Sequence, residues 1–473
     1  MIVMKFGGSS VGQPEAMVAA ADIIAGSRVA AGEIVVVVSA LSGVTDQLLG
    51  LATAAKRGDE DGLSAGLAAL AARHLEMADG LLGGEGAAEY GAFLTATLAE
   101  MERTLRGVAG LGELSGRSSD LIVSVGERLS APLLAAVLRA RGCSAAAVDA
   151  RDCVVAEGAF GNAGADLVRT EAKARALIGP LAVDRVVIVT GFIARRPDGE
   201  TVTLGRGGSD YSATILAHAL GAAEVWIWKE VDGVLTADPK AVPEAALLSR
   251  VSYDEAAEMS FFGAKVLHPL TMAPVMEKGI PIRLRNTFAP DRPGTLIADS
   301  GVPTPHGVKV VSGRKGLALV TVAGKGMAGI TGFAARVFET AGQLGVNILM
   351  ISQASSEQSI CLVTESRDAE RFAVVLRERL KDELSMRAVQ SVGVRDGVAA
   401  IAAVGEGMKG RPGTAAKVFA ATGAAGVNIL AIAQGSSELN ISFIVDQKEM
   451  DRSLRALHAE FALDRLNVCA PAI

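Results

Sequence analysis

Two glycine-rich stretches carry residues whose types and spacing could bind and transfer a phosphate. The first, "KFGGSSVG" (5–12), places Lys5 and two glycines directly after an apolar run. Backbone N–H groups and a cation at the carboxyl end of a buried strand form an anion site in open α/β sheets. The stretch lacks the G-x-x-x-x-G-K-[ST] pattern of a Walker A loop, and an ordinary βα turn is the alternative.

The second stretch, "TLGRGGSDYSA" (203–213), precedes a helix that we expect to begin near Tyr211. It offers backbone amides, a helix N-terminus and the Arg206 guanidinium, which suits a carboxylate or a phosphate. Ser209 and Asp210 fit a helix cap equally well, so a glycine-rich hairpin with a cap is the alternative from these residues alone.

Other polar residues follow apolar runs in the same half of the chain. Glu127 stands in the first turn of an apolar helix, where an acid commonly complements the helix dipole. Ser39 and Thr45, in "VSALSGVTDQ", are hydroxyls that cap the next helix or contact a ligand. Asp238 begins a natural Asp-Pro turn, and Lys265 by itself fits a solvated charge.

The elements that must position these residues form an α/β pattern. Continuous apolar runs at 1–6, 33–40, 184–192, 224–228 and 281–286 predict strands buried on both faces, hence a mostly parallel sheet with helices on either side. Helical patterns lie between them, at 14–25, 128–141 and 211–220. Residues 46–110 are Ala- and Leu-rich and predict a helical insertion.

The last third of the chain is an internal duplication with a spacing of 81, and over 324–360 there are 21 identities in 37 positions. Each copy has the order βαββα, which is a ferredoxin-like split unit. Both copies contain G-x-G-x-x-G, but the strands that follow end in Gln353 and Gln434. A dinucleotide site needs an acid there, so these turns do not fit a dinucleotide-binding fingerprint.

Composition excludes several classes of function. A net charge of −6 argues against a nucleic-acid partner. No apolar stretch of membrane-spanning length stands out, and no signal peptide precedes the first strand, so we expect a cytoplasmic protein without membrane contact. The cysteines and histidines are dispersed and predict no metal site.

Taken in order, "MKFGGSSVG", "VVSALSGVT", "GERLSAPLLAA", "TLGRGGSDYSA", "VDGVLTADP" and "FGAKVLHP" closely resemble the aspartate kinases of the amino-acid kinase superfamily. The duplication looks like the paired ACT domains of that family. This likeness implies that the two G-x-G-x-x-G turns are parts of regulatory domains, whose glycines let an amino acid approach the backbone. The resemblance implies a carbamate-kinase-like αβα sandwich followed by two ferredoxin-like ACT domains. The implied bounds are 1–297 for the catalytic domain, 298–313 for a linker, and 314–392 and 393–473 for the ACT domains, with exchange of the terminal strand left open.

The resemblance implies transfer of the ATP γ-phosphoryl group to the β-carboxylate of aspartate, the first step toward lysine, threonine and methionine. Magnesium-ATP would be the co-substrate, without a prosthetic group or a metal site built from side chains. Lys5 would face the transferred phosphoryl group, Asp210 would orient the lysines, and Glu127 and Arg206 would bind the α-ammonium and α-carboxylate of aspartate. The remaining implied contacts are Ser39, Thr45 and Ser209 for the amino acid, and Gly7, Gly8, Ser9, Lys229, Glu230, Asp238, Lys240 and Lys265 for the nucleotide.

The match has departures in the nucleotide segment, residues 229–240. Lys229 and Glu230 stand where many members have Thr-Asp, Leu235 replaces a common tyrosine, and Lys240 replaces an arginine. These changes leave the adenosine contacts open. We expect a monofunctional enzyme rather than a fusion with homoserine dehydrogenase, because no further domain follows residue 473.

Regulation by an amino acid is the accompanying expectation. The segments around Gln353 and Gln434 resemble those of threonine-responsive members more than lysine-responsive ones, and Asn347 and Asn428 would also contact the effector. Pairing of exposed ACT edges favours a homodimer or a dimer of dimers. Two alternatives are a kinase for another acid such as N-acetylglutamate, whose blocked amine would leave Glu127 without a partner, and a catalytically silent sensor, which the intact site residues disfavour.

Overall fold

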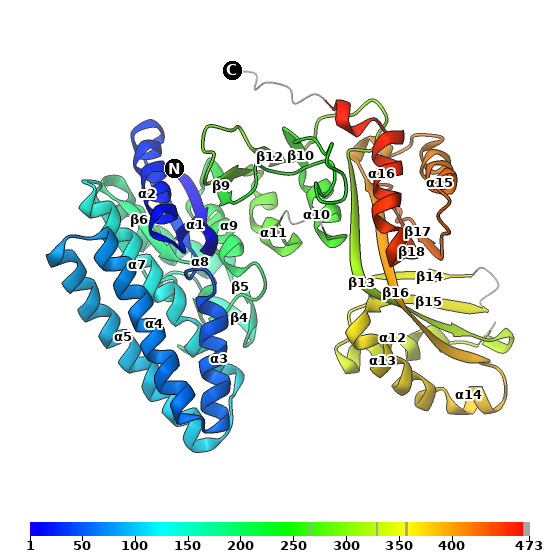
Figure 1. The fold of residues 1–473 in the computed structure, drawn as a ribbon, viewed down its shortest axis with the longest axis horizontal. Helices are drawn as coiled ribbons and strands as arrows, with labels where there is room; N and C mark the ends of the chain where they lie inside the picture. The colour runs from blue at the N-terminus through cyan, green and yellow to red at the C-terminus, as the bar shows by residue number, and fades with distance from the viewer. Residues whose placement is uncertain (264–266, 328–329, 355–357, 467–473) are drawn as a thin grey trace.

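The protein has two lobes, each built on its own sheet (Figure 1). The structure is a computed structural model that describes residues 1–263, 267–327, 330–354 and 358–466. The N-terminal lobe contains an eight-stranded sheet and the C-terminal lobe a six-stranded one. The α/β class and the separate C-terminal architecture expected from the sequence are confirmed.

The five apolar runs of the N-terminal lobe are adjacent strands of its sheet. They form β1 (Ile2–Phe6), β2 (Ile34–Val38), β6 (Val186–Thr190), β9 (Glu224–Lys229) and β11 (Ile282–Asn286). The order is β10-β12-β11-β9-β1-β2-β6-β3, and every neighbouring pair is parallel except β11 with β12. The outer strands are β3 (Ala145–Val148), β10 (Arg250–Ser252) and β12 (Thr295–Ala298). Carboxyl ends of the central strands therefore meet at one edge, where ligands of such sheets bind.

Successive side chains along the strands pack alternately into two separate hydrophobic cores, one on each face of the sheet. Val3 and Val35 pack toward α8 (Leu167–Asp184), α9 (Gly208–Leu220), α10 (Tyr253–Phe261) and α11 (Pro269–Glu277). Met4 and Val36 pack on the other side, toward α2 (Pro14–Ala31) and α7 (Val125–Ala140). Because both faces are covered, the strands are apolar throughout rather than alternating.

The stretch 46–110 is helical, and it projects from the sheet as a bundle (Figure 1). It consists of most of α3 (Val44–Arg57), all of α4 (Glu60–Leu81) and nearly all of α5 (Gly84–Leu111). The adjoining run of α6 (Gly116–Val123) and α7 is long and apolar enough to cross a membrane by composition, which the sequence prediction overlooked. Its most apolar window is 78% buried inside the protein, so this run is a core element.

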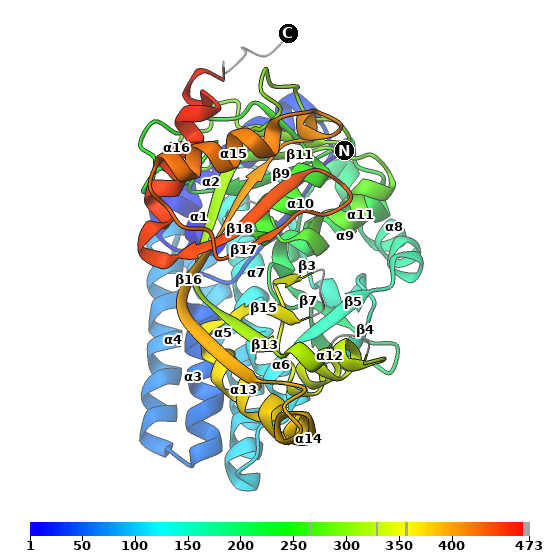
Figure 2. The ribbon, with the colours of Figure 1, turned by 90° about the vertical axis from the view of Figure 1, so that its right-hand side faces the viewer.

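The C-terminal sheet is organised around two long antiparallel strands, β13 (Val310–Ala323) and β16 (Ser391–Val404), which run through both ACT units (Figure 2). The order is β14-β15-β13-β16-β18-β17. The first unit adds β14 (Met350–Gln353), β15 (Ser359–Glu365), α12 (Phe333–Leu344), α13 (Ser366–Arg379) and the short α14 (Lys381–Ser385). The second adds β17 (Ala431–Ala433), β18 (Asn440–Asp446), α15 (Thr414–Ala424) and α16 (Met450–Glu460).

Each ACT unit takes its fourth strand from the other unit's long strand. Leu317–Ala323 of β13 pairs with Ser391–Val398, whereas Val310–Arg314 pairs with Ala400–Val404 beside β18. The prediction of a linker over 298–313 is therefore wrong for residues 310–313, which are sheet. The terminal strand whose exchange was left open, 466–473, lies outside the described residues except for Leu466.

The glycines of the two G-x-G-x-x-G turns serve backbone packing. A Cβ on Gly324 would lie 2.2 Å from the Ala388 carbonyl oxygen, and one on Gly405 would lie 2.1 Å from that of Gly307. Only glycine allows two main-chain segments to approach so closely. The sequence interpretation that these glycines make room for an amino acid is corrected at these two positions, because the protein's own backbone occupies the space.

Candidate active site

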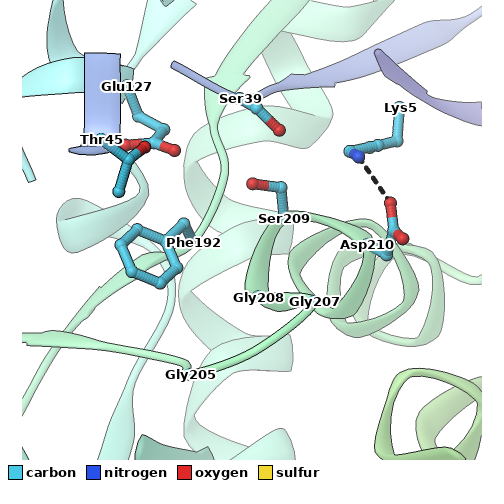
Figure 3. Close-up of a pocket in the computed structure, with 10 residues that line it drawn as sticks. All are labelled: Lys5, Ser39, Thr45, Glu127, Phe192, Gly205, Gly207, Gly208, Ser209 and Asp210. Carbon is cyan, nitrogen blue, oxygen red and sulfur yellow. Dashed lines mark ion pairs between the residues drawn. The ribbon is translucent and has the colours of Figure 1, made fainter. Parts of the chain in front are cut away.

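A cavity of about 240 Å³ lies at the carboxyl ends of β1 and β2, against the N-terminal turn of α9 (Figure 3). Its lining is Lys5, Ser39, Thr45, Glu127, Phe192, Gly205, Gly207, Gly208, Ser209 and Asp210. Residues from five separated stretches of the sequence thus converge on one cavity. Six of the site residues named from the sequence are among them.

Lys5 and Asp210 form a buried ion pair within this cavity. Lys5 Nζ lies 2.6 Å from Asp210 Oδ1, and the two side chains are 9% and 11% exposed. Lys229, the last residue of β9, places its Nζ 3.5 Å from Asp210 Oδ2. Helix α9 begins at Gly208 rather than near Tyr211, so Asp210 lies in its first turn and not in the preceding loop.

The charges of this cluster keep Asp210 ionised. Burial alone would raise the pKa of Asp210, but the positive charges of Lys5 and Lys229 outweigh it and hold the pKa below its usual value. Burial lowers the pKa of Lys229, and the charge of Asp210 opposes that shift. A carboxylate held between two ammonium groups is a poor base, because their charges lower its proton affinity.

Glu127 provides a carboxylate with an unused oxygen. Its side chain is buried in the first turn of α7, and Oε1 accepts a hydrogen bond from the Ala40 N–H at 3.0 Å. Oε2 has no hydrogen-bond partner among the described residues. Burial raises the pKa of Glu127 to about 8. A buried oxygen without a partner carries a desolvation cost, which a bound ammonium group would remove.

Glycine is required at specific points of the surrounding loops. Gly205 and Gly207 both have φ of +73°, in the left-handed region that L side chains rarely adopt. A Cβ on Gly8, at the start of α1 (Gly8–Val11), would lie 2.9 Å from the Ala40 carbonyl oxygen. These glycines bring the loops after β1 and before α9 close to the cavity.

Phe192, which lines the cavity, and Asp120, which supports the strand beside it, were not found from the sequence. Phe192 lines the cavity with φ of +67°, and its N–H donates to Ser212 Oγ at 2.9 Å. Asp120 is buried and accepts from the Gly161 and Thr203 N–H groups at 2.8 and 2.9 Å, which fixes β8 (Thr201–Thr203) ahead of the glycine loop. The Gly-Phe pair after a buried strand could have indicated Phe192, whereas no pattern indicates Asp120.

Several other named residues are not brought into the cavity. Arg206 is exposed between two lining glycines and has no ion-pair partner among the described residues. Asp238 Oδ1 accepts from the Lys240 N–H at 2.9 Å, so it forms the turn expected of Asp-Pro. Lys265 lies outside the described residues. The exposed set outside the cavity comprises Ser9, Glu230, Asp238, Lys240, Asn347, Gln353, Asn428 and Gln434.

Within the part of the chain that the structure describes, no group of three or more His, Cys, Asp or Glu side chains could hold a metal ion. Asp210, the carboxylate nearest Lys5, already faces two ammonium groups. A divalent cation at this site would therefore depend on ligand oxygens rather than on a side-chain cage.

The family model described as "Amino acid kinase family" matches residues 1–286, and the model described as "ACT domain" matches residues 320–380 and 401–461. With the cavity at the carboxyl edge of the first sheet, these matches place the chain in the amino acid kinase family. Within that family it belongs to the aspartokinases. It is 34% identical to aspartokinase 1 of Arabidopsis thaliana over 97% of this chain and 80% of the relative.

Three further comparisons define this relationship. Bifunctional aspartokinase/homoserine dehydrogenase 1 of Arabidopsis thaliana is 37% identical over 100% of this chain but only 52% of its own length, so the chain spans about half of that relative. E. coli aspartokinase III, solved with aspartate and ADP, has a TM-score of 0.81 at 30% identity, covering 97% of this chain and 99% of that one. The same relative solved with lysine and aspartate has a TM-score of 0.79, also at 30% identity, covering 98% of this chain and 99% of that one.

Proposed function

We propose that this protein is an aspartate kinase, which transfers the γ-phosphoryl group of ATP to the β-carboxylate of L-aspartate. The observation that carries the proposal is the unpartnered Oε2 of buried Glu127 in the same cavity as the Lys5–Asp210 pair. One end of the cavity suits an ammonium group, and the other presents a fixed cation. The relative solved with aspartate and ADP supports the same assignment.

In the proposed complex, Glu127 binds the α-ammonium of aspartate, and Arg206 closes over its α-carboxylate. Ser39, Thr45 and Ser209 contribute hydroxyl groups to the pocket. The β-carboxylate then lies toward Lys5. Because a free carboxyl group has a pKa of about 3.9, it is already ionised at neutral pH and requires no general base.

The chemical difficulty is repulsion between two anions that must approach along one line. A carboxylate oxygen of aspartate forms a bond to the γ-phosphorus while the bond to the β–γ bridging oxygen breaks, and ADP leaves. Lys5 and Lys229 reduce this repulsion, and Asp210 holds both cations in place. Magnesium, bound through the phosphate oxygens of ATP, would neutralise further charge. The nucleotide contacts of Gly7, Gly8, Ser9, Glu230, Asp238, Lys240 and Lys265 belong to this proposal.

A panel of acceptors tests the substrate. ADP release would be followed at saturating magnesium-ATP with L-aspartate, L-glutamate or N-acetyl-L-glutamate. We expect turnover with aspartate at least about tenfold above the others, since a missing ion pair or an extra methylene costs of the order of 1–3 kcal/mol. Preference for N-acetylglutamate would assign Glu127 another role, and absence of turnover with every acceptor would favour the silent sensor.

The proposal includes feedback control by an amino acid at the ACT units, in a cytoplasmic enzyme at the first step toward lysine, threonine and methionine. Asn347, Gln353, Asn428 and Gln434 are exposed and available to an effector. Threonine is favoured over lysine by the segments around Gln353 and Gln434, although the E. coli relative was solved with lysine. Titration of activity with each amino acid distinguishes them: inhibition by lysine alone would reverse the preference.

Self-association through the ACT units is the last part of the proposal. The edge strands β14 and β17 expose Ile351 and Ile432 at 46% and 45%. Exposed apolar edge strands are sites of strand pairing between chains, which supports a homodimer or a dimer of dimers. Light scattering of the purified protein, with and without the effector, would give the number of subunits, and a monomer under both conditions would contradict this part.

A further inference from the structure

The nucleotide segment continues into the core of the second ACT unit. Ala237, Ala241 and Val242 pack in one hydrophobic cluster with Val311 of β13 and Phe443 of β18. The cluster therefore crosses the boundary between the two lobes. The segment that follows β9 of the N-terminal sheet is therefore packed against the second ACT unit.

Thr236 adds hydrogen bonds to this apolar contact between the segment and the second ACT unit. Its side chain is buried, and its carbonyl oxygen accepts from the Val311 N–H at 2.9 Å. Its Oγ1 accepts from the Ala246 N–H at 2.8 Å and lies 3.0 Å from Nε2 of His458, which is buried on α16. Because Oγ1 already accepts one hydrogen bond, its own proton is available to the imidazole nitrogen.

The hydrogen bond suits a neutral imidazole that accepts at Nε2. Burial lowers the pKa of His458, which favours that form. Thr236 and His458 are 222 residues apart in the sequence, and Asp238 and Lys240 follow Thr236 within four residues. The position of the turn that carries these two residues is thus fixed by a helix of the second ACT unit.

We propose that His458 is a positioning residue for nucleotide binding: it holds Thr236, and through it the 236–240 turn, in the geometry that binds ATP. The inference rests on the proposed function for the identity of the nucleotide and for its contacts with Asp238 and Lys240. The aspartate end of the cavity is built from Ser39, Thr45 and Glu127 of the N-terminal lobe alone. A displacement of α16 relative to β13 therefore changes affinity for ATP and leaves affinity for aspartate unchanged.

Calorimetric titration with magnesium-ATP, and separately with L-aspartate, tests this role in the full chain. His458→Leu removes the hydrogen-bond acceptor, and loss of one buried hydrogen bond corresponds to a rise of about five- to tenfold in the Kd of ATP. His458→Gln retains an acceptor at similar reach, and we expect ATP affinity within about twofold of the unsubstituted protein. Both variants should bind aspartate normally.

His74→Leu is the matched control. His74 is also fully buried, on α4, and its Nδ1 lies 2.9 Å from the Leu70 carbonyl oxygen, away from the second ACT unit. This variant should bind ATP normally although it too loses a buried imidazole. Thr236→Val removes the same hydrogen bond from the other side without adding volume, together with the one that Oγ1 accepts from the Ala246 N–H. Its ATP affinity answers the question if His458→Leu does not fold.

The outcomes separate the two proposals. Unchanged ATP affinity in His458→Leu or Thr236→Val, or equal losses for ATP and aspartate, would overturn the positioning role. An equal loss of ATP affinity in His74→Leu would also overturn it, because the effect would then be general destabilisation. If the unsubstituted protein binds aspartate but no ATP, the kinase assignment itself fails.

Discussion

Lys5 Nζ, near the end of β1, lies 2.6 Å from Oδ1 of Asp210 in the first turn of α9. The pair joins the two glycine-rich stretches of the sequence at one point of the cavity. Since both side chains are buried, the cation is fixed before any ligand arrives. Preorganised charge of this kind is what phosphoryl transfer between two anions requires.

Replacement of Lys5 by methionine keeps most of the side-chain volume and removes the charge. We expect kcat to fall by about 10²–10³, because the cation acts mainly as charge develops in the transition state, with little change in the KM for aspartate. Steady-state kinetics measure both values. Lys56→Met, on the exposed surface of α3, is the control and should leave both unchanged. A normal kcat in Lys5→Met would exclude Lys5 from the chemistry.

Asp210→Asn leaves Lys5 and Lys229 facing each other without their shared counter-charge. The charge of Asp210 raises the pKa of Lys229 against the effect of burial, so its removal lowers that pKa further. The alkaline limb of the pH dependence of kcat should consequently move to lower pH, together with a fall in kcat. The pH–rate profiles of the two proteins test this. An unchanged alkaline limb would show that Asp210 does not control the charge of the lysines.

Glu127→Gln preserves the shape of the side chain and removes its charge. We expect the KM for aspartate to rise by about tenfold or more, because a buried ion pair to the ammonium is lost, while the Kd for magnesium-ATP stays the same. Glu100→Gln, which disrupts a partly exposed pair with Arg128, is the control. An unchanged KM for aspartate would refute the ammonium-binding role.

The raised pKa of Glu127 makes a second, pH-dependent prediction. With a pKa of about 8, the carboxyl group of the empty site is mostly neutral at pH 7 and must lose its proton to pair with an ammonium ion. The value of kcat/KM for aspartate should rise with pH and level off above about 8, since this ratio reports the free enzyme.

The same shift affects stability with a definite sign. The folded pKa lies above the unfolded one, so the stabilising contribution of the protonated group is fully present below about 4.5 and is lost as pH rises through about 8. Unfolding of the empty protein at pH 6 and pH 8.5 should show this loss, and Glu127→Gln should reduce it. If both proteins respond to pH alike, Glu127 is not the titrating group.

The two lobes are also joined by a buried ion pair, in which Lys309 Nζ lies 2.6 Å from Glu255 Oε2. The other carboxylate oxygen of Glu255, Oε1, accepts a hydrogen bond from the Glu406 N–H at 2.8 Å. Lys309→Met alone should lower the free energy of unfolding by about 3–5 kcal/mol, because it leaves a buried charge unpaired. The Lys309→Met/Glu255→Gln double variant removes both charges and keeps an oxygen that can accept from the Glu406 N–H, so it should recover most of that loss. Denaturant unfolding measures both, and equal destabilisation by the single and double variants would contradict this account.

The sequence predicts the central strands well because a strand buried on both faces needs a continuous apolar run, and such runs stand out. The duplication, the helical insertion and the two phosphate-type loops are visible for similar local reasons. Lys5, Ser209 and Asp210 could be named because glycine-rich loops after strands and before helices concentrate at ligand sites.

Long-range pairing accounts for most of what the sequence could not predict. Val310 and Val311 follow a Pro- and Gly-rich stretch that is typical of a linker, and their place in the sheet depends on β16. The contact of Thr236 with His458 has no local signal in either segment. The free oxygen of Glu127 is likewise a property of packing, since the sequence shows only an acid in a first helical turn.

The assignment as an aspartate kinase is tested most directly by identifying the product. The protein would be incubated with magnesium-ATP, L-aspartate labelled with ¹³C at the β-carboxyl carbon, and hydroxylamine, which traps acyl phosphates as hydroxamates. The account predicts a labelled β-hydroxamate formed in the same amount as ADP, and its absence in Lys5→Met. ADP release without hydroxamate, or no reaction at saturating substrates, would contradict it.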